Sequence, residues 1–127
     1  MRDGSVTTLN SELRMESRSN PPVSRFAGKR VHFIGIAGCG MAGLARMLID
    51  AGAIVTGSDP SPSAQSLGLT QLGANISRTQ LGELLHREID LVVRTAAGPD
   101  TNLEFVAATK LGLKSIRYAQ LLGQVLR

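Results

Sequence analysis

The stretch that decides the fold runs from His32 to Ala45 and reads HFIGIAGCGMAGLA. It opens with apolar residues typical of a buried parallel strand and continues with apolar residues at helical spacing. Between the two lie Gly38, Gly40 and Gly43, in the pattern G-x-G-x-x-G. Such glycines permit a sharp turn, a close approach of the backbone to phosphate oxygens, and close packing of helix on strand. The stretch therefore predicts a phosphate loop in which amides of the helix's first turn face an anion. The alternative is a glycine-rich turn with no ligand.

Outward from this loop, short apolar runs alternate with segments of helical periodicity. We expect strands over residues 31–36, 53–56, 74–76, 89–93 and 114–116. Helices are expected over residues 41–51, 61–72, 79–87, 102–111 and 119–126, with Ser61 or Ser63 capping the second and Thr79 the third. The alternation predicts an α/β fold, a Rossmann-like doubly wound parallel sheet of about five strands in the order 3-2-1-4-5. Ligands of such sheets bind outside the carboxyl ends of the strands, at the switch point beside the first strand.

Residues 1–28 differ in composition from the rest of the chain. They are rich in Ser, Thr, Asn and Arg, contain Pro21-Pro22 and show neither helical nor strand periodicity. We interpret them as a flexible leader, with a folded domain over residues 29–127. A transit peptide would share the Arg and Ser content, but Asp3, Glu12 and Glu16 argue against it.

The charge of +4 is concentrated at the amino end of the 127-residue chain. Residues 1–30 carry six basic and three acidic side chains, whereas residues 31–127 carry eight basic and seven acidic ones. The folded part is thus nearly neutral and lacks both a basic stripe and an aromatic platform, which argues against a nucleic-acid partner. The single cysteine favours a reducing compartment. With neither a long apolar run nor a secretory signal, we expect a cytoplasmic location and no membrane partner.

Catalytic and metal-binding residues are not apparent. His32 is more typical of a sheet residue than of a base, His86 of a solvated helix position, and Cys39 of a small residue tolerated in a tight loop rather than a reactive thiol. Two histidines and one cysteine suggest no metal set. The single Gly-Lys pair, at residues 28–29, lacks the spacing of an ATP P-loop. We expect a chain that holds a nucleotide without performing the chemistry.

Residues 32–59, HFIGIAGCGMAGLARMLIDAGAIVTGSD, resemble the opening of the Mur ligases, whose pattern reads HFIGIGGxGMSGLA followed by G-S-D at a strand end. Further parts of that pattern follow in order at residues 72–74 (LGA), 89–93 (IDLVV), 95–97 (TAA), 99–102 (PDTN), 104 (E) and 118–122 (YAQLL). The resemblance covers about residues 30–127 and is closest to the member of the family that adds L-alanine.

The resemblance implies a fold and a role in peptidoglycan synthesis for the cell wall. In that family a first domain binds the UDP part of UDP-N-acetylmuramate, a second carries the ATP P-loop, and a third receives the amino acid. This chain is expected to be the first domain, with the ATP-binding and C-terminal ligase domains absent. It would belong to an ATP-dependent, ADP-forming acid–amino-acid ligase and be inactive alone. We expect no cofactor on this domain; ATP and Mg belong to the full-length ligase.

The resemblance also implies site residues. The diphosphate would lie on the backbone of Gly38, Cys39, Gly40 and Met41. The uridine would lie between Ser58 and Asp59 on one side and Thr95 and Ala96 on the other, with Asn102 nearby. Asp59 also follows the second strand about 20 residues after the loop, where a ribose hydroxyl is usually held. The alternatives are that Asp59 caps the next helix and that the Thr95 hydroxyl bonds its own backbone.

The chain departs from the family pattern at several places. Ala37 replaces a Gly, Ala42 a Ser and Tyr118 an Arg, Arg94-Thr95 replaces Ser-Ser, and Gly-His is missing around Thr79-Gln80. Two other functions stay open. One is an NAD(P)-binding Rossmann domain of an oxidoreductase or regulator, and the other is the related recycling ligase that joins a tripeptide to the same UDP-sugar.

Overall fold

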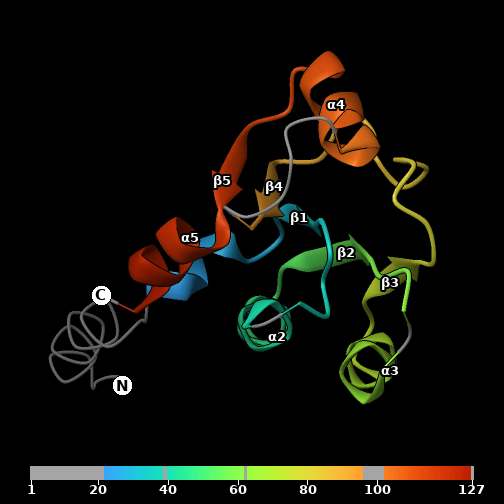
Figure 1. The fold of residues 1–127 in the computed structure, drawn as a ribbon. Helices are drawn as coiled ribbons and strands as arrows, with labels where there is room; N and C mark the ends of the chain where they lie inside the picture. The colour runs from blue at the N-terminus through green and yellow to red at the C-terminus, as the bar shows by residue number, and fades with distance from the viewer. Residues whose placement is uncertain (1–21, 39, 62, 96–101, 127) are drawn as a thin grey trace, which may run out of the picture.

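A computed structural model describes residues 22–38, 40–61, 63–95 and 102–126. Five parallel strands form one sheet in the order β3-β2-β1-β4-β5. They are β1 (Arg30–Phe33), β2 (Ile54–Ser58), β3 (Asn75–Ser77), β4 (Leu91–Arg94) and β5 (Ser115–Arg117). The predicted sheet and its strand order are confirmed, and all five carboxyl ends meet at one edge (Figure 1).

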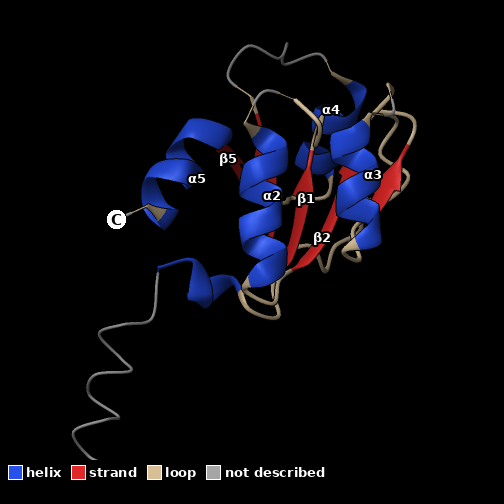
Figure 2. Ribbon diagram, turned by 90° about the horizontal axis from the view of Figure 1, so that it is seen from below, coloured by secondary structure: helices blue, strands red, loops and turns tan. Residues whose placement is uncertain are grey.

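Helices cover both faces of the sheet, as expected for a doubly wound fold (Figure 2). The helices are η1 (Pro22–Phe26), α2 (Met41–Asp50), α3 (Ala64–Gln71), α4 (Leu103–Lys110) and α5 (Tyr118–Val125). On one face, α2, α3, α5 and η1 enclose the larger apolar cluster, which includes Phe33, Leu48 and Leu121. On the other face, α4 packs on a smaller cluster through Ala108. Successive strand residues alternate between these two faces.

Side-chain caps start two of the helices, at Ser63 as predicted and at Asn102, where only the start of a helix was predicted. Ser63 is the N-cap of α3, and its Oγ accepts a bond from the Ser66 amide while Ser66 Oγ accepts one from the Ser63 amide. Asn102 caps α4 by accepting a bond from the Phe105 amide. Both helices therefore begin with part of their open amides satisfied.

The helix predicted over residues 79–87 is wrong. The described residues between β3 and β4 form bends and turns. Thr79 donates its hydroxyl to the Glu83 carboxylate instead of capping a helix. Gly82 has a φ of +87°, which interrupts helical geometry, and a Cβ there would lie 3.0 Å from the Cβ of Ala107. Leu85 still packs against the smaller cluster, so its apolar spacing reflects burial in an irregular segment.

The packed part of the chain also begins before residue 29. Val23 of η1 is only 8% exposed and lies in the larger cluster. The Gly28 amide donates to the Gly52 carbonyl at 2.9 Å, and Arg25 donates to Gln124 at 2.6 Å. These contacts could not be predicted from the sequence, because the segment is polar and one buried valine in a short 3₁₀ helix produces no periodic pattern. The rest of the predicted leader, residues 1–21, lies outside the described residues.

Candidate functional site

The glycine loop connects β1 to α2 at the carboxyl edge of the sheet. The chain turns at Gly35, whose φ is +75°, and again at Gly40, whose φ is +78° and which precedes α2 without a side-chain cap. The amides of Gly38 and Met41 donate within the loop, to the carbonyls of Gly35 and Gly38, both at 2.9 Å.

Other amides of the loop have no such partner. Those of Ala37, Gly40 and Ala42 have no acceptor among the residues that the structure describes. Open amides beside a helix N-terminus can bind an anion. The described part of the loop therefore retains donors for phosphate oxygens.

Gly40 is needed for space as well as for its φ. A Cβ at this position would lie 2.2 Å from the hydroxyl oxygen and 2.6 Å from Cζ of Tyr118, the first residue of α5. Tyr118, which stands in place of the family's Arg, thus closes one side of the loop. The side chain of Met41 is fully buried, so only its backbone can face a ligand, and its amide already donates to Gly38.

Gly43, the third glycine of the motif, does not provide close packing of helix on strand. A Cβ on Gly43 would meet nothing within 4 Å, because the residue faces outward from α2. The close approach lies instead at Gly57 of β2, where a Cβ would be 2.8 Å from the Cβ of Ile36. Gly57 lies outside the G-x-G-x-x-G motif, and its packing role was not predicted, although the family's G-S-D pattern includes it.

Asp59 follows β2 and presents an unused carboxylate oxygen. The residue is 6% exposed, and its Oδ1 accepts a bond from the Ser61 amide at 3.1 Å. Its Oδ2 is buried and has no hydrogen-bond partner among the described residues. The alternative in which Asp59 caps the next helix is wrong, because Ser63 does so. Asp59 lines a hollow of about 180 Å³ together with polar groups of Ser66, Thr70 and Arg78.

Ser58 belongs to a buried chain of polar side chains. Its Oγ accepts a bond from the Gly35 amide at 3.1 Å and donates to Glu104 Oε1 at 2.6 Å. Glu104 Oε2 lies 2.8 Å from His32 Nε2, and His32 Nδ1 lies 2.7 Å from Thr56 Oγ1. His32 is thus a sheet residue, as expected, but with both ring nitrogens engaged. No local sequence pattern predicted this function of Glu104, although the family pattern includes that residue.

The remaining predicted residues fall in three groups. Thr95 is half-buried directly after β4. Asn102, besides capping α4, donates from Nδ2 to Gln80 Oε1 at 3.2 Å, and Gln80 Nε2 lies 3.8 Å from where a Cβ on Gly35 would be. The structure thus brings Asn102 to the glycine loop through Gln80, a residue that the sequence analysis did not select. Cys39 and Ala96 lie outside the described residues.

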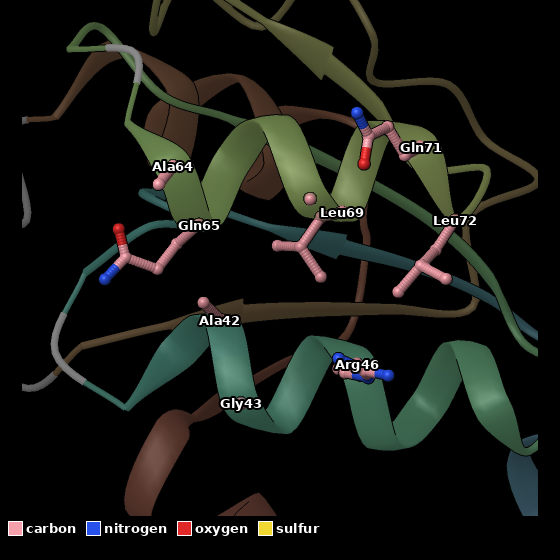
Figure 3. Close-up of a pocket in the computed structure, with 9 residues that line it drawn as sticks. Ala42, Gly43, Arg46, Ala64, Gln65, Leu69, Gln71 and Leu72 are labelled. Atoms are coloured by element: carbon pink, nitrogen blue, oxygen red, sulfur yellow. The ribbon is translucent and has the colours of Figure 1, made fainter.

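A larger groove lies elsewhere, between α2 and α3 (Figure 3). It has a volume of about 430 Å³, and its lining includes small and apolar residues such as Ala42, Gly43, Leu69 and Leu72. Arg46 is its one charged lining residue. Because a nucleotide needs convergent donors and acceptors, the loop and Asp59 form the better candidate site.

The described residues contain neither a metal centre nor a membrane-spanning helix. Within residues 22–38, 40–61, 63–95 and 102–126, no three His, Cys, Asp or Glu side chains gather as a metal site would require. In the same ranges, none of the helices has the length and apolar character needed to traverse a bilayer.

Residues 30–127 match the family model described as "Mur ligase family, catalytic domain". The chain belongs to the Mur ligase family. This Mur ligase chain is 43% identical over 99 residues to the UDP-N-acetylmuramate–L-alanine ligase of Clostridium novyi, covering 78% of this chain and 21% of that one. It therefore spans about a fifth of the length of such relatives.

Solved structures show the same fold. The UDP-N-acetylmuramate–alanine ligase of Thermotoga maritima superposes with a TM-score of 0.71 at 28% identity, covering 76% of this chain and 22% of that one. A UDP-N-acetylmuramate:L-alanyl-gamma-D-glutamyl-meso-diaminopimelate ligase from Neisseria meningitides gives 0.68 at 30% identity, with coverages of 77% and 31%. D-lactate dehydrogenase of Escherichia coli, at 23% identity and 0.52, shares the fold alone.

Proposed function

We propose that this Mur ligase chain is the UDP-sugar-binding domain of a UDP-N-acetylmuramate–L-alanine ligase. One observation carries the proposal. Asp59 Oδ2 is buried and lies at the end of β2, beside the strand whose loop carries the amides of Ala37, Gly40 and Ala42; within the described residues, neither Oδ2 nor these amides have a hydrogen-bond partner. A ligand that joins an anion to hydroxyl groups, as a nucleoside diphosphate does, satisfies both.

In this proposal each part of the site binds one part of the ligand. The diphosphate lies against the loop from Gly38 to Met41, where the N-terminal end of α2 favours negative charge. A ribose hydroxyl donates to Asp59 Oδ2. Thr95 and Ala96 lie beside the uracil, and Asn102 holds the neighbouring segment. Ser58 supports the loop instead of touching the uridine, because its hydroxyl proton is used by Glu104.

The chemistry of the ligase belongs to parts of the protein beyond this domain. The sequence contains no P-loop that would hold ATP, so no phosphoryl transfer is assigned to these residues. The family reaction activates the muramyl carboxylate with ATP and Mg before the amine of L-alanine attacks. We propose that this chain contributes binding and orientation of the UDP-sugar in the cytoplasm, and that the chain alone is inactive.

Calorimetric titration of the purified 127-residue chain tests the proposal. UDP-N-acetylmuramate should bind and NADH should not. UDP alone should retain part of the affinity, because the loop and Asp59 contact the nucleotide portion. Preferential binding of NADH would overturn the proposal in favour of an NAD(P)-binding domain.

The tripeptide-adding ligase is a second candidate, favoured by the structural likeness to the Neisseria enzyme at a TM-score of 0.68. Titration does not separate the two, because both ligases are expected to use the same UDP-sugar. Assaying the complete gene product with ATP, UDP-N-acetylmuramate and either L-alanine or the tripeptide does. Activity with the tripeptide alone would replace the proposed assignment.

A further inference from the structure

Four polar side chains form a continuous buried chain beneath the glycine loop. Thr56, His32, Glu104 and Ser58 follow one another at separations of 2.7, 2.8 and 2.6 Å. His32, Glu104 and Ser58 are each at most 1% exposed. They come from β1, β2 and α4, and 72 residues separate His32 from Glu104 along the chain. The fold therefore gathers them on the face of the sheet that α4 covers.

The donors and acceptors of this chain can be assigned step by step. The Gly35 amide donates to Ser58 Oγ, so the Ser58 hydroxyl proton goes to Glu104 Oε1. Glu104 Oε2 then accepts the proton on His32 Nε2, and His32 Nδ1 pairs with the Thr56 hydroxyl. None of these four side chains has a buried polar atom left unpaired. A fully satisfied buried network specifies one arrangement of its members.

The arrangement is not that of a hydrolytic triad. The Ser58 hydroxyl donates to the carboxylate of Glu104 and not to the imidazole of His32. The imidazole is therefore not placed to take the proton of the serine hydroxyl, as it does in a hydrolytic triad. Its burial also keeps substrate away. What the network does reach is the Gly35 amide, at the residue where the chain leaves β1 with a φ of +75°.

We propose that His32, Glu104 and Ser58 are positioning residues that fix the start of the glycine loop from the α4 side of the sheet. Ser58 Oγ accepts from the amide of Gly35, where the chain leaves β1, and Glu104 holds the Ser58 hydroxyl in the orientation that accepts this amide. The open amides further along the loop then keep their orientation toward a phosphate. This role rests on the proposed function only where it concerns nucleotide affinity.

The test compares Ser58→Ala and Glu104→Gln with the control Val125→Ala, which removes buried carbon atoms from α5 outside the network. Ser58→Ala removes the acceptor for the Gly35 amide. Gln keeps the size of Glu104 and can accept from His32, but its amide group cannot accept the Ser58 proton. Hydrogen exchange of the Gly35 amide, measured without ligand at a temperature where all chains are folded, should quicken at least tenfold in Ser58→Ala and less in Glu104→Gln. It should stay within twofold of the starting chain in Val125→Ala.

Affinity for UDP-N-acetylmuramate is the second measurement. It should fall about five- to fiftyfold in Ser58→Ala, by less in Glu104→Gln, and not in Val125→Ala. If Ser58→Ala does not fold, Glu104→Gln carries the test. An unchanged Gly35 exchange rate in the folded variants overturns the positioning role, whatever the ligand. If the starting chain binds no UDP-sugar, the proposed function fails, and the exchange measurement still decides this inference.

Discussion

At Gly40 both the backbone conformation and the packing require a residue without a Cβ. Its φ of +78° is unfavourable for residues with a Cβ, and that Cβ would also strike Tyr118 at 2.2 Å. Gly40→Val should therefore turn the loop amides away from the ligand. Since backbone strain of this kind costs about 1–3 kcal/mol, we expect affinity for UDP-N-acetylmuramate to fall more than tenfold in calorimetric titration.

Gly43→Ala is the matched control for that substitution. Gly43 belongs to the same motif, but a Cβ there has no neighbour within 4 Å. Alanine should raise helix stability by roughly 0.5–1 kcal/mol and leave affinity within twofold. Equal losses in the two variants would show that the motif acts through something other than the geometry at Gly40.

Asp59→Asn should separate binding from stability. The substitution keeps the size of the side chain and the oxygen that accepts from Ser61, but places an NH₂ group where Oδ2 can accept a ribose hydroxyl. A hydrogen bond to a charged group contributes about 1.5–3 kcal/mol, so UDP affinity should fall at least tenfold. The thermal unfolding midpoint should not fall, since Oδ2 has no partner to lose. Loss of stability with unchanged affinity would instead identify Asp59 as structural.

Residue motifs selected the loop and Asp59 of the candidate site and not the buried network beneath the loop. The loop glycines and Asp59 lie at the spacings found in strand–loop–helix units that bind the phosphates of a nucleotide. A short stretch of sequence is therefore enough to select them. The bonds from Glu104 to His32 and Ser58 join residues far apart in the chain. Their geometry depends on where α4 lies, which no local pattern contains.

At the scale of elements, the connection between β3 and β4 shows how a periodic pattern can mislead. Leucines at helical spacing over residues 81–85 predicted a helix, but Gly82 at a φ of +87° breaks it, and Leu81 is 64% exposed. Local side-chain bonds stabilise the irregular path instead, among them Thr79 to Glu83. The strands and the other helices agree with prediction because each contributes at least one apolar side chain to one of the two apolar clusters.

The Thr79 bond can be tested through the Glu83 carboxyl. The Thr79 hydroxyl donates to it and lowers the pKa of Glu83 below its ordinary value of 4.5. Because the folded pKa is lowered, the bond stabilises the fold above the ordinary pKa and is lost as pH falls through the lowered value. Thr79→Ala should raise the pKa of Glu83 toward 4.5, measured by NMR titration of the side-chain carboxyl carbon. Ser77→Ala removes a weaker contributor to the same pKa and should change it less.

At the scale of the whole molecule, the sheet joins two apolar layers of unequal size. The larger layer draws on η1, α2, α3 and α5, whereas α4 and irregular segments enclose the smaller one. The buried polar network lies on the α4 side of the sheet. Through Ser58 it contacts the glycine loop, which leads into α2 on the side of the larger layer. Both layers thus contribute to the candidate site, which lies at the carboxyl ends of β1 and β2, next to the point where the strand order reverses between β1 and β4.

η1 packs into the core before the predicted boundary at residue 29, so we expect it to belong to the cooperative unit. Val23 packs into the cluster that includes Leu121 and Val125 of α5, so removing its two methyl groups leaves a cavity between η1 and the rest of the core. Val23→Ala should lower the free energy of unfolding by about 1–3 kcal/mol in urea titration, with an unchanged slope. Ser24→Ala, next to it and without a side-chain bond within the described residues, is the control and should change stability by less than about 0.5 kcal/mol. If the two variants unfold alike, residues 22–28 lie outside the cooperative unit and the boundary inferred from composition is correct.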